Sequence, residues 1–180
     1  MIFTNNKAVF LDRDGVLNKD KVDYVYQIED FHILDGVIEA IEILKKNGFV
    51  LVVITNQSGI AKGIYTEIEV EKCWQYLQQK CNFLIDDHYF APHHPKYTTE
   101  SLSRKPDSLL LEKAIAKYKI DVKNSWIVGD SNRDIEAGKK VGIKTIQILG
   151  TKASHEKPSE ITDFSVNSLL EATKIICAIE

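Results

Sequence analysis

Short apolar runs separated by longer amphipathic segments dominate the pattern of hydrophobic and polar positions along the chain. Runs of this length, bounded by polar residues, are typical of strands that are buried on both faces of a parallel sheet. Between them, apolar residues recur at the three- and four-residue spacing of helices that cover a sheet. The predicted strands are 7–11, 49–54, 87–90, 125–128 and 145–149.

The segments between these strands carry recognisable helix ends. Thr66 and Glu69 match a capping box, Gly48 and Gly142 stand where helices commonly end, and Pro106 is suited to a first helical turn. The predicted helices are 37–47, 66–81, 106–118, 135–141 and 168–178, with a polar loop at 150–162. Strands that alternate with helices predict the α/β class, with a doubly wound, mainly parallel, Rossmann-like sheet.

Two carboxylates directly follow the first predicted strand. Asp12 and Asp14 are two residues apart, and Gly15 lets the backbone turn so that both can face one small volume. In open α/β sheets, ligands bind beyond the carboxyl ends of the strands. Taken alone, D-x-D-G is explained more simply by an Asx-type turn that caps a helix. The choice between the two interpretations depends on the rest of the chain.

Other strand ends carry polar groups of complementary kinds, namely Thr55, Lys105, Asp130 and Asp134. Asp12, Asp130 and a backbone carbonyl near Asp14 offer the hard oxygen ligands that Mg²⁺ prefers. Thr55 can donate a hydrogen bond to a phosphoryl oxygen, and Lys105 can balance the remaining charge. The combination predicts Mg²⁺-dependent phosphoryl transfer.

Four motifs, in this order, resemble those of the haloacid dehalogenase superfamily of aspartyl-phosphate phosphatases. They are D-R-D-G at 12–15, T-N-Q-S-G-I-A-K-G at 55–63, R-K-P at 104–106 and G-D-S-N-R-D at 129–134. Within the superfamily, residues 7–150 are similar to the branch that contains D-glycero-D-manno-heptose-1,7-bisphosphate 7-phosphatase and histidinol-phosphatase.

The resemblance implies a role for each matching residue. The implied catalytic residues are Asp12 as nucleophile, Asp14 as general acid and base, and the phosphoryl-binding pair Thr55 and Lys105. The implied Mg²⁺ ligands are Asp12, the Asp14 carbonyl and Asp130, while Asp134 orients Lys105. The expected substrate contacts are Asp20, Tyr24, Asn56, Arg104 and Ser131.

The spacing of the motifs leaves no room for a large cap domain, because the predicted helices and strands use almost all of the intervening positions. We therefore expect one phosphatase domain over 1–180, roofed only by a short β-flap at 18–26 and a loop at 91–104. An open site of this kind suits a phosphorylated sugar.

The 91–104 loop departs from the branch that the chain resembles. That branch carries a zinc site of the form C-x-H followed by C-x-C, and the equivalent positions here are Ala91, His93, Ser101 and Ser103. A single imidazole cannot make a four-coordinate zinc site, so we expect Mg²⁺ and no zinc. His93 and His94 are then loop residues or substrate contacts, and we assign no role to His32, His88 or His155.

Composition and charge exclude several other classes. The net charge is −3, with no long block of one sign, which argues against a nucleic-acid or anionic-membrane partner. No apolar run is long enough to span a membrane, and the first residues show no signal-peptide pattern. Cys73, Cys81 and Cys177 lack C-x-x-C spacing and are expected to be reduced thiols. We expect a cytoplasmic monomer.

Two alternatives from other classes have to be weighed. Receiver domains of phosphorelays also use an acidic cluster, a threonine and a lysine, but their phosphorylated aspartate lies on a later strand than the acidic pair. Here Asp12 and Asp14 share one loop, which favours an enzyme. The second alternative is a non-catalytic phosphosugar-binding protein, and against it every catalytic position is filled.

Among substrates, the 7-phosphate of a heptose 1,7-bisphosphate is favoured over histidinol phosphate. A bisphosphate carries a second dianion, and Arg104 offers a planar fork that can bind it in a bidentate manner. Lys19 and Lys21 of the flap add attraction. The cationic amine of histidinol phosphate would find acceptors in Asp20, Asp23 or Glu100, so the flap charges do not decide between the two substrates.

Overall fold

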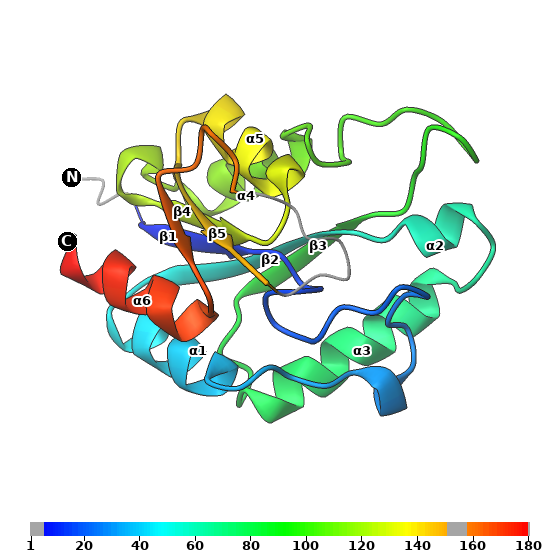
Figure 1. The fold of residues 1–180 in the computed structure, drawn as a ribbon, viewed down its shortest axis with the longest axis horizontal. Helices are drawn as coiled ribbons and strands as arrows, with labels where there is room; N and C mark the ends of the chain where they lie inside the picture. Colours follow the sequence, from blue (N-terminus) through cyan, green and yellow to red (C-terminus); the bar gives the residue numbers. More distant parts are fainter. Residues whose placement is uncertain (1–5, 151–157, 180) are drawn as a thin grey trace.

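The computed structural model describes residues 6–150 and 158–179. In these residues, six strands form one parallel sheet in the order β3-β2-β1-β4-β5-β6 (Figure 1). The strands are β1 (Ala8–Leu11), β2 (Val50–Asn56), β3 (Asp87–Ala91), β4 (Trp126–Gly129), β5 (Lys144–Ile148) and β6 (Phe164–Val166). The strand that precedes the acidic pair, β1, lies at the centre, where it pairs with both β2 and β4.

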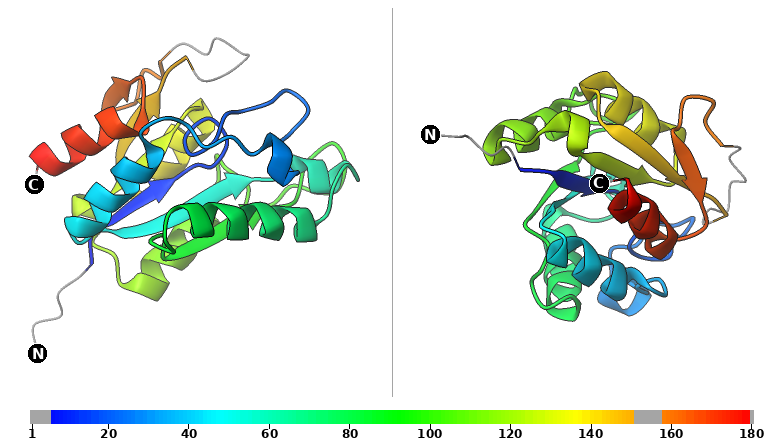
Figure 2. Two further views of the ribbon diagram at one scale, coloured as in Figure 1. Left: turned by 90° about the horizontal axis from the view of Figure 1, so that it is seen from below. Right: turned by 90° about the vertical axis from the view of Figure 1, so that its left-hand side faces the viewer.

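Helices cover both faces of the sheet (Figures 1 and 2). One face carries α1 (Val37–Lys46), α3 (Glu67–Lys80) and α6 (Leu169–Ala178), and the other carries α4 (Leu109–Tyr118) and α5 (Asn132–Val141). Shorter helical segments are η1 (Ile28–Asp30), α2 (Ser58–Ala61) and η2 (Val122–Asn124).

The side chains of β1 show how the two faces are filled. Val9 and Leu11 belong to the hydrophobic cluster under α1, α3 and α6, whereas Ala8 and Phe10 belong to the cluster under α4 and α5. Successive strand residues point to opposite faces, so a strand that is apolar throughout is buried on both. The doubly wound α/β class is confirmed, and the described residues contain no large inserted cap.

Several local signals form the predicted helix ends. The backbone N–H of Thr66 donates to Glu69 Oε2 at 2.9 Å, and Thr66 Oγ1 accepts from the N–H of Ile68, so the capping box at the start of α3 is confirmed. Gly48 and Gly142 follow α1 and α5 with φ of 80° and 78°. This left-handed conformation is accessible to glycine at little cost.

Other predictions differ from the structure. Helix α4 begins at Leu109, after Pro106, and α5 begins at Asn132, because Ser131 and Asp134 form a capping box that the sequence analysis missed. Helix α2 and strand β6 were not predicted; β6 has three residues, of which only Val166 is buried. His155 and part of the predicted 150–162 loop lie outside the described residues.

The predicted β-flap at 18–26 is wrong, because this segment forms no strand. Asn18 makes isolated bridges with Asp14 and Ile33, and the carbonyl of Val25 accepts a hydrogen bond from Arg13 Nη2 at 2.7 Å. A buried side chain therefore fixes the segment where a strand ladder was expected.

Within the described part of the chain, no helix has the length and apolar character needed to cross a membrane.

Candidate active site

A cavity of about 570 Å³ lies beyond the carboxyl ends of β1, β2 and β4. Its floor, as we name it, consists of five polar residues at or near the strand ends: Asp12, Thr55, Lys105, Asp130 and Asp134. Its roof consists of the flap, 18–26, and the 92–104 loop, which begins one residue later than the predicted 91–104 because Ala91 belongs to β3. The cavity brings together every site residue predicted from the sequence, the others being Asp14, Asp20, Tyr24, Asn56, Arg104 and Ser131.

Lys105 connects the floor residues. Its ammonium lies 2.9 Å from Asp12 Oδ1 and 2.6 Å from Asp134 Oδ1, and it donates to the carbonyl of Ile54 at 2.6 Å. These three acceptors match the three donors of an ammonium group. Although burial alone would lower the pKa of Lys105, the neighbouring carboxylates raise it above the ordinary value. The lysine is therefore charged and held against the predicted nucleophile.

Asp12 and Asp134, which both contact Lys105, differ in how readily they ionise, because the pKa of Asp134 is, despite its burial, lowered by Lys105 and Ser131. Burial raises the pKa of Asp12 to about 6, even though the charge of Lys105 opposes this rise. Oxygens of Asp12, Asp130 and Asp134 lie within 4.8 Å of one another. Both oxygens of Asp134 are engaged, Oδ1 with Lys105 and Oδ2 with Ser131, whereas Asp12 meets Lys105 through Oδ1, so Asp12 and Asp130 are the pair best suited to a cation. This hard-oxygen set, with an excess of negative charge, fits Mg²⁺.

Arg13 is a site residue that the sequence analysis did not identify. Its guanidinium is almost wholly buried and donates to both oxygens of Asp14, through Nε at 3.1 Å and Nη2 at 3.0 Å. Asn18 adds a third donor to Asp14 at 2.9 Å. Because Arg13 also bonds the carbonyl of Val25, it joins the predicted general acid to the flap. The sequence signal was the basic Arg13 between the acidic Asp12 and Asp14, directly after a buried strand.

Asn56 and Ser131 line the cavity, but their polar atoms also serve the floor. The amide of Asn56 donates to the Lys105 carbonyl at 2.9 Å and accepts from its N–H at 3.0 Å, which clamps the lysine backbone to β2. The hydroxyl of Ser131 donates to Asp134 at 2.6 Å. Their contact with substrate stays a prediction.

Positive charge gathers where the cavity meets the roof. Arg104 donates to Ser58 Oγ at 2.6 Å, and Arg133, which the sequence analysis did not identify, lines the same cavity. Burial, followed by the charge of Arg133, lowers the pKa of Arg104. The pKa of His94 is also lowered, through desolvation and then the charges of Arg104 and Lys62. The part of the cavity lined by Arg104 and Arg133, which we call its mouth, is suited to an anionic group.

The 92–104 loop is closed by short polar contacts. Ser101 Oγ and Ser103 Oγ are 2.8 Å apart, and Arg104 Nη1 donates to the carbonyl of His93 at 3.4 Å. Among the residues that the structure describes, the floor aspartates form the only group of three or more metal-ligating His, Cys, Asp or Glu side chains. His88, outside the loop, stacks on Trp74 at 4.2 Å.

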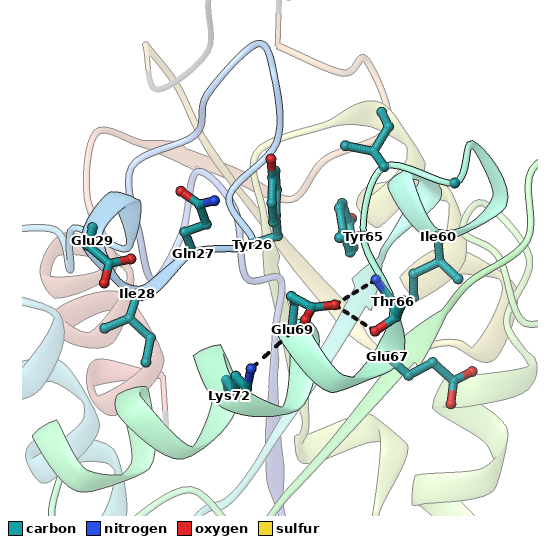
Figure 3. A pocket seen from close by; sticks show the side chains of 12 residues that line it. Tyr26, Gln27, Ile28, Glu29, Ile60, Tyr65, Thr66, Glu67, Glu69 and Lys72 are labelled. Carbon is teal, nitrogen blue, oxygen red and sulfur yellow. Dashed lines mark hydrogen bonds and ion pairs between the residues drawn. The ribbon is translucent and has the colours of Figure 1, made fainter.

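A second, larger groove of about 940 Å³ lies beside the flap (Figure 3). Tyr26 and Tyr65 stand side by side along it, with ring centroids 5.1 Å apart, and Glu69 on α3 is bonded to Thr66. None of the floor residues lines this groove. The smaller cavity, which gathers the carboxylates and the buried lysine, is therefore the candidate active site.

Comparisons with known proteins agree with this geometry. The HAD-hydrolase-like family model matches residues 90–172. D-glycero-beta-D-manno-heptose-1,7-bisphosphate 7-phosphatase from Haemophilus influenzae is 38% identical, over 95% of this chain and 97% of its own. The corresponding alpha-heptose enzyme from Photorhabdus laumondii is 36% identical, over 94% of this chain and 96% of its own.

A solved structure shares the fold. It is a D,D-heptose 1,7-bisphosphate phosphatase from B. bronchiseptica, complexed with magnesium and phosphate, with a TM-score of 0.87 at 24% identity, covering 97% of this chain and 99% of its own. The relatives are phosphatases, which favours the enzyme over the receiver-domain and binding-protein alternatives. Because relatives that are 36% and 38% identical align over nearly the whole chain, and the HAD-hydrolase-like model matches residues 90–172, the protein belongs to the haloacid dehalogenase superfamily and is a phosphatase.

Proposed function

We propose that this phosphatase hydrolyses a phosphomonoester through a covalent intermediate on Asp12. An Asp12 oxygen attacks phosphorus while the ester P–O bond breaks, and the leaving alkoxide takes a proton from Asp14. Asp14 then removes a proton from water, which attacks the phosphorus of the acyl phosphate. This second step releases inorganic phosphate and restores the Asp12 carboxylate.

The observation that carries the proposal is the contact of Asp12 with Lys105 at the bottom of the cavity. A carboxylate 2.9 Å from a buried ammonium is held in one place, and Asp12 lines the cavity that a phosphoryl group would enter. Thr55, which is 2% exposed, lines the same space and offers a hydroxyl donor. Fixed charges and donors of this kind supply most of the stabilisation in phosphoryl transfer.

Asp12, Asp130 and the backbone carbonyl of Asp14 are the proposed Mg²⁺ ligands. When bound there, Mg²⁺ would neutralise the acidic cluster and the charge of the phosphoryl oxygens. The raised pKa of Asp12 supports this assignment, because a buried carboxylate with this cost of ionisation is stabilised by a nearby cation.

For the substrate, we propose the 7-phosphate of a heptose 1,7-bisphosphate. Arg104 and Arg133 at the mouth, with Lys62 near enough for its charge to act on His94, would attract the second phosphate of such a sugar and disfavour the cationic amine of histidinol phosphate. The names of the relatives support the same choice. Since these names include both anomers, both should be assayed.

Two measurements test the proposal. Rapid acid quenching of the enzyme during turnover of a phosphate-labelled ester should trap label on the protein, and Asp12→Asn should abolish that label. Steady-state assays with Mg²⁺ should give a higher kcat/KM for heptose 1,7-bisphosphate than for histidinol phosphate. The opposite order would overturn the substrate while leaving the chemistry intact, whereas labelled Asp12→Asn protein would overturn the nucleophile.

A further inference from the structure

Gln57 has no part in the steps above, yet its buried side chain lies between two of the proposed catalytic groups. Its Nε2 donates to Thr55 Oγ1 at 2.9 Å and to Asp14 Oδ2 at 3.2 Å. Its Oε1 accepts a hydrogen bond from Tyr65 Oη at 2.7 Å. A carboxamide has two N–H donors, so one goes to each catalytic group and none is left over.

Tyr65 determines which end of the Gln57 amide faces the catalytic groups. Rotation of the amide by 180° would exchange its oxygen and nitrogen, and the surrounding hydrogen bonds decide between the two orientations. Tyr65 donates its proton to the amide oxygen. Burial raises the pKa of Tyr65, which keeps that proton in place. The nitrogen is therefore left for Thr55 and Asp14.

The ring of Tyr65 is itself closely packed against two neighbours, Tyr26 and Gly59. Tyr26 of the flap stacks on it with an interplanar angle of 13° (Figure 3). Gly59 also lies against the ring, because a Cβ added there would overlap the ring carbon Cε1. A side chain at position 59 would therefore displace the ring, and the bare backbone there lets the hydroxyl reach Gln57.

The two bonds that Gln57 donates have different consequences. Because Thr55 Oγ1 accepts from Gln57, its own proton is directed to another acceptor, and a phosphoryl oxygen in the cavity can fill that place. Asp14 receives its other donors from Arg13 and Asn18, which are close to it in the sequence. Gln57 comes from the end of β2 and is the contact that ties Asp14 to the strand carrying Thr55.

We propose that Gln57, oriented by Tyr65, is a positioning residue that fixes the Asp14 carboxylate and the Thr55 hydroxyl relative to each other. The inference rests on the proposed role of Asp14 as general acid. It goes further by proposing that Gln57, the glutamine of T-N-Q, and Tyr65, beside the flap, align that acid with the phosphoryl site.

The test is Gln57→Met, which keeps the length of the side chain but removes all three hydrogen bonds. It should be assayed with 4-nitrophenyl phosphate and phenyl phosphate, whose leaving groups differ in their need for a proton. A general acid contributes 10²–10⁴-fold, so a misplaced acid should cost phenyl phosphate about tenfold more kcat than 4-nitrophenyl phosphate. Inhibition by inorganic phosphate should weaken several-fold, because Thr55 loses its alignment.

Two further variants separate positioning from structural support. Tyr65→Phe keeps the stacked ring and removes only the hydroxyl, so kcat should again fall more on phenyl phosphate than on 4-nitrophenyl phosphate, by a smaller factor. This variant provides the test if Gln57→Met does not fold. Gln78→Met is the matched control, because Gln78 on α3 is a buried amide that donates to the Ile85 carbonyl and does not line the cavity. It should lower the melting temperature without changing the ratio of the two rates.

The outcomes are distinguishable. Equal losses of kcat on both esters in Gln57→Met and Tyr65→Phe would overturn the positioning role. Asp14→Asn is assayed in parallel: if it discriminates between the esters and the Gln57 and Tyr65 variants do not, only this inference fails. If Asp14→Asn itself shows no discrimination, the general-acid role of Asp14 fails, and this inference fails with it.

Discussion

The floor of the active site and the 92–104 loop of its roof differ sharply in burial and bonding. Lys105 and Asp130 in the floor are 2% and 3% exposed, whereas Tyr97 and Leu102 in the loop are 56% and 68% exposed. The floor ammonium contacts two carboxylates and a carbonyl, while the loop is closed by a serine pair and a few backbone contacts. The flap is intermediate between the two in how firmly it is held, because Val25 bonds the buried Arg13 and Tyr26 stacks on Tyr65.

This difference separates chemistry from recognition. Groups that act on phosphorus need fixed positions in a site shielded from water, which the floor provides. Three of the expected substrate contacts, Asp20, Tyr24 and Arg104, lie in the roof and are only partly buried, and we expect them to influence which ester is accepted. Changes in the floor should therefore affect all substrates, and changes in the roof should affect some substrates more than others.

The largest effect is expected from Asp12→Asn in the floor. The variant lacks the carboxylate nucleophile, so turnover should fall by more than about 10²-fold. That is already the smallest contribution expected of a general acid or base. Steady-state assays on aryl and sugar phosphates should show the same loss, with a near-native circular dichroism spectrum. Residual activity above a hundredth of the wild-type rate would rule out the nucleophile assignment.

Asp14→Asn should give the next largest effect, which depends on the leaving group. Esters with poor leaving groups should lose about 10²-fold or more in kcat, because no proton reaches the departing oxygen. Aryl phosphates with acidic leaving groups should lose much less. A plot of log kcat against leaving-group pKa measures the difference, and a slope unchanged from wild type would contradict the acid role.

In the roof, Arg104→Ala should reduce kcat/KM for heptose 1,7-bisphosphate by about 1.5–3 kcal/mol, the usual worth of a charge-assisted hydrogen bond. This is a fall of roughly 10- to 150-fold. A minimal aryl phosphate has no second phosphate to lose and should be affected less. Lys96→Ala, which removes an exposed positive charge elsewhere in the loop, is the control. An equal loss on both substrates would place Arg104 with the floor.

The smallest effect, no change in the melting temperature, is expected when zinc is removed. Because Ala91, Ser101 and Ser103 offer no thiolates, elemental analysis of the purified protein should find no stoichiometric zinc. A zinc-selective chelator should leave the melting temperature unchanged, whereas added Mg²⁺ should raise it through binding to the folded state. Asp130→Asn should reduce that rise. About one zinc per chain would contradict the prediction.

The sequence predicted the parts of the molecule that local patterns encode. Apolar runs give β1, β2 and β4, and polar residues at their ends mark the floor. The start of α5 was missed because Asp134 was interpreted only through its contact with Lys105, although it also caps the helix with Ser131.

The remaining features depend on contacts between distant residues. The flap was predicted as a β-flap from alternating residues, but the side chain of Arg13 holds it in another conformation. Likewise, nothing in T-N-Q alone reveals that Gln57 meets Tyr65, since the approach depends on the missing Cβ of Gly59. Such contacts become visible only when the chain is folded.

The serine pair of the 92–104 loop has a consequence for the conditions in which the enzyme can work. Thiolates that hold zinc are targets for peroxide and for thiophilic metals such as cadmium. Ser101 and Ser103 bond to each other through hydroxyl groups, which neither agent attacks. Cys73 and Cys81 are buried in the core, and the partly buried Cys177 lies on α6 and does not line the cavity. We therefore expect catalysis to persist through oxidative stress, cadmium exposure and zinc starvation that would open a thiolate-held loop.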